Sequence, residues 1–253
     1  MRKPFCFGII PARYASSRFP GKPLALIDGM PMFWHVYRRA KACPLLLDVA
    51  LATDDERIAE KAAELGVSFV ITSPHHKSGT DRVYEAAWKL SLPKHFVVAN
   101  IQGDEPLLEP AMLRDLLLPF YNDEAVQVST LAHPISDEEA LNKNRVKIAM
   151  GLNGNALYFS RAPIPYTRNQ PETDNPLALG NSFLGHIGLY AFRLETLIQF
   201  VKLEPSPLEL REGLEQLRFL ENGIPVHVAL TKYLSQAVDT PEDLKKVEEL
   251  LLA

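Results

Sequence analysis

The chain has 253 residues, a formal net charge of −4 and 23% charged residues. That length accommodates one α/β domain with a large core and a smaller excursion from it. The slightly acidic balance excludes a general basic field for nucleic acid. An anionic ligand must therefore be met by a local cluster of cations, which favours a small-molecule site.

The cellular compartment is predicted from the cysteines and from the apolar runs. The two cysteines have neither the density of a disulfide scaffold nor the C-x-x-C spacing of a zinc site. No uncharged run reaches the roughly 20 residues of a transmembrane helix, and the apolar start of the chain is shorter than a signal-peptide core of roughly 7–15 residues. We expect a cytoplasmic protein without membrane insertion.

The first predicted elements are a buried strand at 5–10 and the cationic loop that follows it. The strand is continuously apolar and too short for a helix. The loop carries Arg13, Arg18 and Lys22 beside glycine and proline, and fixed positive charge at the end of a strand suits a polyphosphate. Its spacing is neither the Walker nor the dinucleotide-binding pattern. A surface turn with solvated charges is the alternative.

The next part of the chain alternates helices and strands, which predicts a parallel sheet covered on both faces. Its elements are a helix at about 31–42, a strand at 47–52, a helix from 53, a strand at 67–71, a helix from 78 and a strand at 96–101. Ligand sites in such folds lie beyond the carboxyl ends of the strands.

The segment Ser78-Gly79-Thr80-Asp81-Arg82 stands at such a strand end. There Ser78, Gly79 and Arg82 can meet a base or a phosphate, and an ordinary helix cap explains the serine equally well. His75 and His76, just before it, are interpreted as turn residues rather than as ligands.

Asp104 is the leading candidate for a metal ligand. It follows Gln102 and Gly103 directly after a buried strand, so its carboxylate is held at the edge of the sheet. Hard cations such as Mg²⁺ take one or two protein carboxylates plus substrate phosphates. An Asx-type turn is the alternative for Asp104, and Glu105 is assigned a structural role.

From about residue 126 the pattern loosens. Asn153-Gly154 predicts a hairpin, and residues 166–181 form an irregular stretch of a length that is usually functional or mobile. We therefore predict a single domain over the whole chain, with a lid or dimerisation excursion at about 126–193. Arg161, at the mouth of the loop, can bind a carboxylate bidentately or be an ordinary surface charge.

The last third of the chain adds a strand at 183–193 and a helix whose leucines repeat over 210–220. His186 and Tyr190 lie on one pleated face of the strand, where each can face a polar pocket or be a satisfied core residue. Asp239 stands just ahead of a helix that Thr240 caps, so it has no capping duty and is a natural partner for Asp104 on a metal.

Eight blocks in order resemble the sugar-acid cytidylyltransferases, specifically the CMP-Kdo synthetase (3-deoxy-manno-octulosonate cytidylyltransferase) family. The blocks are Pro11 to Pro23, Ala52-Thr53-Asp54-Asp55, Ser78 to Arg82, Gln102-Gly103-Asp104-Glu105-Pro106, Ala156 to Arg161, His186 to Tyr190, Glu215-Gln216-Leu217-Arg218 and Val238 to Asp243. The resemblance implies a Rossmann-like, mixed but mostly parallel sheet of the nucleotidyltransferase kind. It also implies Mg²⁺-dependent transfer of CMP from CTP to the sugar acid Kdo for lipopolysaccharide synthesis, by a homodimer.

Carried over by position, the resemblance implies a role for each candidate residue. Arg13 and Lys22 would bind the CTP phosphates, and Asp104 and Asp239 would bind Mg²⁺. The residues that would contact the nucleotide or lie beside the sugar are Ser78, Gly79, Arg82 and Gln102. The residues that would line the sugar-acid pocket are Arg161, His186, Tyr190, Glu215 and Gln216. Arg13, Lys22, Asp104 and Asp239 are then the catalytic set.

The chain departs from the family pattern at three places, namely Gly151, Gly185 and the segment 234–237. The two glycines stand where relatives commonly have an acidic and a basic residue, which puts minor sugar contacts in doubt. The segment 234–237 affects the loop that presents Asp239. Two alternatives stay open: an acceptor related to Kdo, such as an 8-amino variant, and a nucleotide-binding regulator without catalysis.

Overall fold

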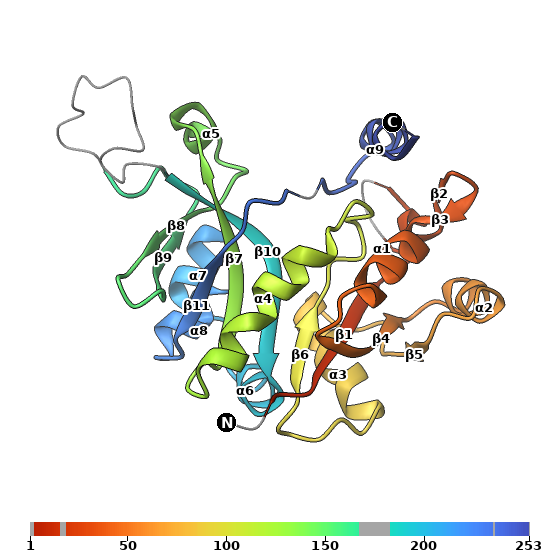
Figure 1. The fold of residues 1–253 in the computed structure, drawn as a ribbon, viewed down its shortest axis with the longest axis horizontal. Coiled ribbons are helices and arrows are strands. Elements are labelled where there is room, and N and C mark those ends of the chain that lie inside the picture. Colours follow the sequence, from red (N-terminus) through yellow and green to blue (C-terminus); the bar gives the residue numbers. More distant parts are fainter. Residues whose placement is uncertain (1–2, 16–18, 167–182, 235, 253) are drawn as a thin grey trace.

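The computed structural model describes residues 3–15, 19–166, 183–234 and 236–252. Within these residues the centre of the fold is a nine-stranded sheet in the order β11-β7-β10-β6-β1-β4-β5, with β8 beside β10 and β9 beside β8 (Figure 1). The strands are β1 (Cys6–Ala12), β4 (Leu46–Thr53), β5 (Phe69–Ile71), β6 (Val97–Asn100), β7 (Val128–Ile135), β8 (Lys147–Met150), β9 (Ala156–Ser160), β10 (Phe183–Arg193) and β11 (Val226–Leu230). A separate hairpin joins β2 (Leu26–Ile27) to β3 (Met30–Pro31).

The sheet is mixed. β1 pairs in parallel with β4 and β6, β4 with β5, and β7 with β11. β10 runs antiparallel to β6, β7 and β8, and β8 runs antiparallel to β9. This confirms the expected fold class and the hairpin at Asn153-Gly154, whose turn is closed by a hydrogen bond from the Gly154 N–H to the Gly151 carbonyl oxygen.

Helices cover both faces of the sheet. They are α1 (Met32–Lys41), α2 (Glu56–Glu64), α3 (Gly79–Lys89), α4 (Pro110–Asn122), α5 (Asp137–Leu141), α6 (Leu194–Phe200), α7 (Pro207–Glu212), α8 (Leu217–Glu221) and α9 (Pro241–Leu252). The apolar sides of α1, α2 and α4 share one core with the sheet, and those of α3, α6 and α8 share the core on the opposite face.

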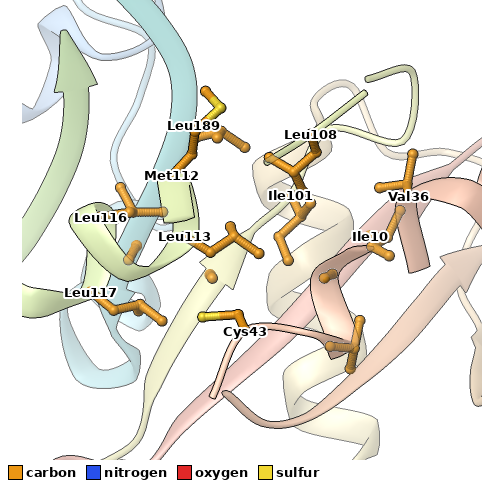
Figure 2. Packing of buried hydrophobic residues seen from close by; sticks show 14 of the residues in the cluster. Ile10, Val36, Cys43, Ile101, Leu108, Met112, Leu113, Leu116, Leu117 and Leu189 are labelled. Carbon is orange, nitrogen blue, oxygen red and sulfur yellow. The ribbon is translucent and has the colours of Figure 1, made fainter. Parts of the chain in front are cut away.

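The first core shows why the early strands read as continuous apolar runs. From α4, Leu113 points toward Ile101 of the sheet side and Met112 lies beside Leu189 (Figure 2), and all four are fully buried. Each such aliphatic side chain contributes about 1.5–3 kcal/mol through its removal from water. Strands covered on both sides need apolar residues at successive positions, which is the pattern of β1.

One predicted helix is wrong in extent. The leucine repeat over 210–220 falls on two short helices, α7 and α8, because Gly213 takes a left-handed conformation with φ of 63° and ends α7. Leu210 is consequently 71% exposed instead of buried. The break places Glu215 and Gln216 on a turn rather than within a helix.

The region predicted as an excursion at 126–193 is not set apart from the domain. It contributes β7 and β10 to the middle of the sheet, and its β8–β9 hairpin pairs with β10 through β8. Most of the loop predicted at 166–181 lies outside the described residues, as do residues 16–18 of the cationic loop. The lid and dimerisation roles stay predictions.

The chain ends in α9, which lies beside the β2–β3 hairpin after a long extended segment (Figure 1). A small third core joins Ile27 and Met32 to Val238 and Val247. This contact brings the segment before α9 back to the carboxyl end of β6, where the Val238 N–H donates to the Asp104 carbonyl oxygen at 2.8 Å. None of the described helices is long and apolar enough to cross a membrane.

Candidate active site

A pocket of about 300 Å³ opens at the carboxyl ends of β1 and β6. We call it the cationic pocket; it is lined by Pro11, Ala12, Arg13, Lys22, Pro23, His76, Lys77, Ser78, Gly79, Arg82, Gln102, Gly103, Asp104 and Asp239. The structure therefore brings together every residue that the sequence assigned to the nucleotide and to the metal. They come from four separate parts of the chain, as expected for the strand ends of an α/β sheet.

Gly103 allows the strand ends to approach each other. A Cβ at this position would lie 2.7 Å from the Pro11 carbonyl oxygen, so a larger residue would force β6 away from β1. With glycine there, the chain turns and presents Asp104 to the pocket. The Asx-turn alternative leaves unexplained why this aspartate lies against a lysine from another loop.

Lys22 bridges the two candidate metal ligands. Its Nζ lies 2.6 Å from Asp104 Oδ2 and 3.4 Å from Asp239 Oδ1. The lysine side chain is 14% exposed, and the two carboxylates are 30% and 40% exposed. Both carboxylates therefore contact the same ammonium group, and this site stays partly open to solvent.

These residues fit a hard divalent cation. Carboxylate oxygens are the ligands that Mg²⁺ prefers, and the ion commonly takes only one or two from protein and the rest from substrate phosphate and water. No group of three or more histidine, cysteine, aspartate or glutamate residues gathers in a metal-binding arrangement within the described part of the chain. Asp104 and Asp239 would thus be the protein's share of the coordination.

The position of Asp239 is fixed by the cap of α9. Asp243 Oδ2 accepts hydrogen bonds from the Asp239 and Thr240 N–H groups at 3.3 and 3.1 Å, and from the Thr240 hydroxyl at 2.9 Å. The Thr240 hydroxyl in turn accepts from the Asp243 N–H at 3.3 Å. This is the reciprocal cap expected from the sequence, and it orients the residue immediately before it.

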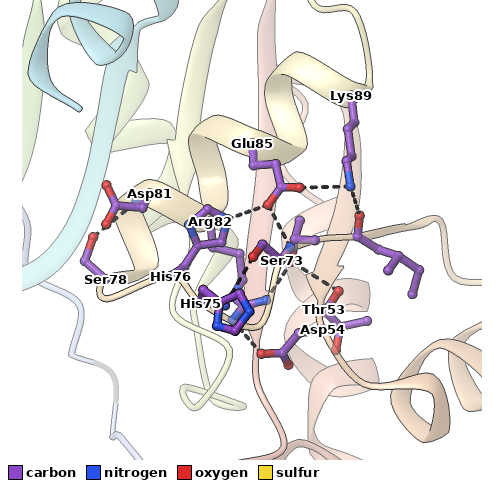
Figure 3. A network of polar contacts seen from close by, with 12 residues as sticks. Thr53, Asp54, Ser73, His75, His76, Ser78, Asp81, Arg82, Glu85 and Lys89 are labelled. Carbon is purple, nitrogen blue, oxygen red and sulfur yellow. Dashed lines mark hydrogen bonds and ion pairs between the residues drawn. The ribbon is translucent and has the colours of Figure 1, made fainter. Parts of the chain in front are cut away.

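Arg82 lines the pocket but its guanidinium is already bound to protein (Figure 3). One Nη donates to Asp54 Oδ2 at 2.8 Å and the other to the Thr72 hydroxyl at 2.6 Å, and the residue is only 3% exposed. It therefore ties α3 to the ends of β4 and β5. A direct contact of Arg82 with a nucleotide stays a prediction.

His76 differs from the turn residue that the sequence suggested. It lines the cationic pocket, and its Nε2 is hydrogen-bonded to Glu85 on α3. Glu85 also accepts from the Ser73 N–H at 2.8 Å and pairs with Lys89 at 2.8 Å (Figure 3). Burial favours a raised pKa for Glu85, but the hydrogen bonds from Lys89, Ser73 and His76 prevail and lower the pKa to about 2. The ionised carboxylate of Glu85 holds the imidazole of His76 at the pocket. Nothing in the sequence indicated this contact, because the two residues are nine positions apart and no motif links them.

A second polar cluster lies on the α3 face of the sheet, beside the cationic pocket. The rings of His186 and Tyr190 are 5.4 Å apart, as their shared pleated face predicted, and the Thr130 hydroxyl is 2.9 Å from His186 Nε2. Burial lowers the pKa of His186 to about 3, so the imidazole is neutral near pH 7. Burial likewise raises the pKa of Tyr190.

Glu215 joins this cluster from the turn between α7 and α8, and Gln216, its neighbour on that turn, is 7% exposed. The Thr80 hydroxyl donates to Glu215 Oε2 at 2.5 Å, and burial raises the pKa of this carboxyl group despite hydrogen bonds from Thr80 and Ser78. Gln102 spans the two sites: it lines the cationic pocket and donates from Nε2 to the Gly188 carbonyl oxygen at 2.9 Å. The two sites are therefore adjacent.

Asn100 is a polar residue of this cluster that the sequence reasoning missed. It pairs with Tyr190 across β6 and β10 and is 4% exposed. Its Oδ1 has no hydrogen-bond partner within the described part of the chain. A buried polar atom without a partner is unusual and marks a position where a ligand or water can bind. The signal in the sequence was an asparagine in an otherwise apolar strand.

Arg161 holds a turn in this structure, and three of its five guanidinium N–H groups are bound to backbone carbonyl oxygens. Its Nε donates to the Glu212 carbonyl oxygen at 2.8 Å, and its Nη atoms donate to the Lys143 and Gly213 carbonyl oxygens at 3.2 and 3.4 Å. These bonds fasten the turn that precedes Glu215. The contact of Arg161 with a carboxylate stays a prediction.

The two glycine departures differ in the room they leave. At Gly185 a Cβ would lie 2.7 Å from a side-chain carbon of Ile135 and 3.2 Å from His133 Nε2, so the sheet there has no space for a basic side chain. At Gly151 a Cβ would lie 3.0 Å from Asn153 Oδ1, within the hairpin turn. Neither position faces the cationic pocket.

The chain is similar to known cytidylyltransferases over most of its length. A family model described as cytidylyltransferase matches residues 7–232. The chain belongs to the cytidylyltransferase family.

Individual relatives of the family extend the likeness. A protein of Nitratidesulfovibrio vulgaris named 3-deoxy-manno-octulosonate cytidylyltransferase is 56% identical over 246 residues, covering 97% of this chain and 96% of the relative. A protein of the same name from Geobacter metallireducens is 44% identical over 247 residues, covering 96% of each.

Solved structures of cytidylyltransferases and of a related nucleotidyltransferase share the fold. The structure of a CMP:2-keto-3-deoxy-manno-octonic acid synthetase complexed with CTP matches with a TM-score of 0.90 and 39% identity, covering 98% of both chains. A putative glucose-1-phosphate thymidylyltransferase from Bacillus anthracis matches with a TM-score of 0.66 at 17% identity, which shows the fold alone.

Proposed function

We propose that this cytidylyltransferase transfers CMP from CTP to Kdo (3-deoxy-manno-octulosonate), giving CMP-Kdo and pyrophosphate. The observation that carries the proposal is the meeting of the loop with Arg13 and Lys22, the Asp104–Asp239 pair and the buried polar cluster at one end of the sheet. The names of relatives that are 44–56% identical over nearly the whole chain give the same reaction.

The reaction is an in-line displacement at the α-phosphorus of CTP. The anomeric hydroxyl oxygen of the sugar acid forms the new bond to phosphorus, the bond to the β-phosphate oxygen breaks, and the hydroxyl proton is lost to solvent. The protein positions two anions and stabilises charge on the leaving pyrophosphate. Arg13, which is exposed at the pocket mouth, and Lys22 supply the positive charge for this on a chain of net charge −4.

We further propose that Asp104 and Asp239 hold Mg²⁺. When bound, the ion neutralises phosphate charge and draws the phosphate oxygens into a fixed geometry. The two carboxylates would hold the ion, and the cap of α9 keeps Asp239 in place for it.

The polar cluster suits the hydroxyl-rich acceptor. Neutral His186, Tyr190 and the Asn100 Oδ1 offer hydrogen-bond donors and acceptors to the hydroxyl groups of the acceptor. A pocket built to hydrogen-bond hydroxyl groups discriminates strongly against analogues that lack them. Arg161 would meet the acceptor carboxylate by exchanging one of its carbonyl partners.

The specificity part of the proposal is tested by a coupled assay of pyrophosphate release. The four ribonucleoside triphosphates are each combined with Kdo, and CTP is combined with Kdo, an 8-amino Kdo variant and a sialic acid. We expect turnover with CTP and Kdo at least tenfold above any other pair. A higher rate with the 8-amino variant would reassign the acceptor, and no release with any pair would favour the regulator.

A homodimer is also proposed, as the family resemblance implies. Leu152 and Leu157 on the β8–β9 hairpin are exposed, the latter by 67%, and apolar residues on a protruding hairpin are suited to a subunit contact. Light scattering is expected to give twice the monomer mass of 28.3 kDa. A monomer mass at working concentration would remove the dimer from the account.

A further inference from the structure

Lys22 stands where a metal ion held by both carboxylates would have to lie. Its ammonium touches Asp104 Oδ2 at 2.6 Å and Asp239 Oδ1 at 3.4 Å. The lysine is presented by a short 3₁₀ turn, Lys22–Leu24, that follows Gly21 in a left-handed conformation with φ of 72°. The flexible part of the arrangement is thus the four-carbon stem of the lysine, not the backbone that carries it.

Two cations cannot occupy this position together at low cost. Carboxylates in one site repel each other, and a single cation between them removes that repulsion. A divalent ion entering the site would meet the ammonium as a like charge at close range. The ammonium must therefore leave the carboxylates before, or as, the metal binds.

The nucleotide supplies the alternative partner for the ammonium. Under the proposed function the triphosphate enters the cationic pocket, which Lys22 lines. Its oxygens carry more charge than one carboxylate pair, and lysine binds phosphate as a movable point charge.

We propose that Lys22 is an exchangeable counter-ion that couples metal binding to nucleotide binding. In the free enzyme it bridges Asp104 and Asp239 and competes with a divalent cation. When nucleotide binds, the lysine moves to the phosphates and the carboxylates accept the metal. The inference rests on the proposed function only in placing a divalent cation at this carboxylate pair and a nucleotide triphosphate beside it.

The test is Mn²⁺ binding to the nucleotide-free protein, followed by the electron paramagnetic resonance signal of free Mn²⁺. Lys22→Met is expected to bind Mn²⁺ about fivefold more tightly than the wild type, the scale of a partly exposed ion pair of about 1 kcal/mol. Loss of a binding-site lysine thus improves binding of one ligand. Lys22→Gln, which keeps a polar end on a slightly shorter side chain without charge, is expected to behave in the same way.

Arg13→Met is the matched control, because it removes the same charge from the same pocket but not from between the carboxylates. Arg13 is exposed, so solvent screens its effect and the Mn²⁺ affinity is expected to change less than twofold. Adding Asp104→Asn to Lys22→Met is expected to abolish the tightening. Thermal unfolding of every variant confirms that it is folded.

Two results would overturn the exchange. Unchanged or weaker Mn²⁺ binding in both Lys22 variants would mean that the lysine arranges the carboxylates for the metal. Equal tightening in Arg13→Met would mean a general field and no specific competition. Failure of the proposed function would give a different result. If the Lys22 variants bind Mn²⁺ more tightly as expected but the wild type transfers no CMP, the exchange of Lys22 stands and the proposed reaction is wrong.

Discussion

Asp104, Asp239 and Lys22 form the smallest unit on which the chemistry depends. Their side chains are partly exposed, so they contribute little to the core and their ion pairs are individually weak, of the order of 0.2–1 kcal/mol. Changes at these residues should therefore separate activity from stability. Changes at the neighbouring cap of α9 should instead lower stability more than activity.

Asp104→Asn and Asp239→Asn are each expected to reduce turnover below one per cent of the wild type while the thermal midpoint changes by only a degree or two. The reason is that the amide keeps the shape but loses the charge that a divalent cation needs. Thr240→Ala is the control: loss of this N-cap costs about 1 kcal/mol of stability and should affect the rate less. Near-normal activity of either Asn variant at saturating Mg²⁺ would remove the two-carboxylate site.

Arg161→Ala is expected to raise the KM for the sugar acid at least tenfold and to leave the affinity for CTP unchanged, as measured calorimetrically without acceptor. The guanidinium supports the turn that carries Glu215 and lies away from the cationic pocket. Weaker CTP binding with an intact fold would mean that the segment 156–165 serves the nucleotide.

At the scale of elements, two features connect helices to the site: the Glu85 network that anchors the segment before α3, and the glycine that ends α7. Glu85 fastens Ser73, His76 and Lys89 together at the pocket wall. Gly213 sets the turn of Glu215 and Gln216.

Glu85→Gln is expected to lower the free energy of unfolding at pH 7 and to alter its pH dependence. The pKa of Glu85 is about 2 in the folded protein against 4.5 for an ordinary glutamate, so its ionised form stabilises the fold above pH 4.5 and this contribution is lost as the pH falls toward 2. The difference between variant and wild type should therefore shrink across that window in urea titrations. A difference that is constant from pH 7 to pH 2.5 would contradict the lowered pKa.

Gly213→Ala is expected to cost about 1 kcal/mol of stability, because alanine is strained at a left-handed φ of 63°. Gly66→Ala is the matched control, with a φ of 67°, open space around the added Cβ and a position at the end of α2 away from the polar cluster. Both should lose similar stability, but only Gly213→Ala should raise the KM for the sugar acid. Equal kinetics for the two variants would show that the turn does not govern the acceptor site.

Local patterns account for the elements that the sequence predicted well. Apolar runs and caps locate β1, β4, β6 and α3, because a strand covered on both faces and a capped helix are decided by neighbouring residues. The Gly213 break was missed because the leucine spacing on either side continues a helical repeat. The insertion of antiparallel β10 between β6 and β7 depends on contacts between distant segments, which spacing does not reveal.

In the candidate site, too, the positions of the side chains were predicted better than their contacts with distant residues. Motif positions predicted which residues gather in the cationic pocket, since strand ends share one edge of the sheet. The partners of Arg82 and Arg161 could not be predicted, because they are Asp54, Thr72 and backbone carbonyl groups that no motif marks. A motif thus predicts where a cationic side chain lies in the fold, but not which group it binds.

For the whole molecule, the central claim is that one domain joins CTP and Kdo in adjacent sites and transfers CMP between them. The most direct measurement is ³¹P NMR of the protein with CTP, Kdo and Mg²⁺. The account predicts that a phosphodiester resonance of CMP-Kdo and the pyrophosphate resonance appear in equal amounts while CTP disappears, and that neither appears without Kdo. The account would be contradicted if CTP bound but stayed intact in the presence of Kdo and Mg²⁺. It would also be contradicted if pyrophosphate appeared together with free CMP instead of CMP-Kdo.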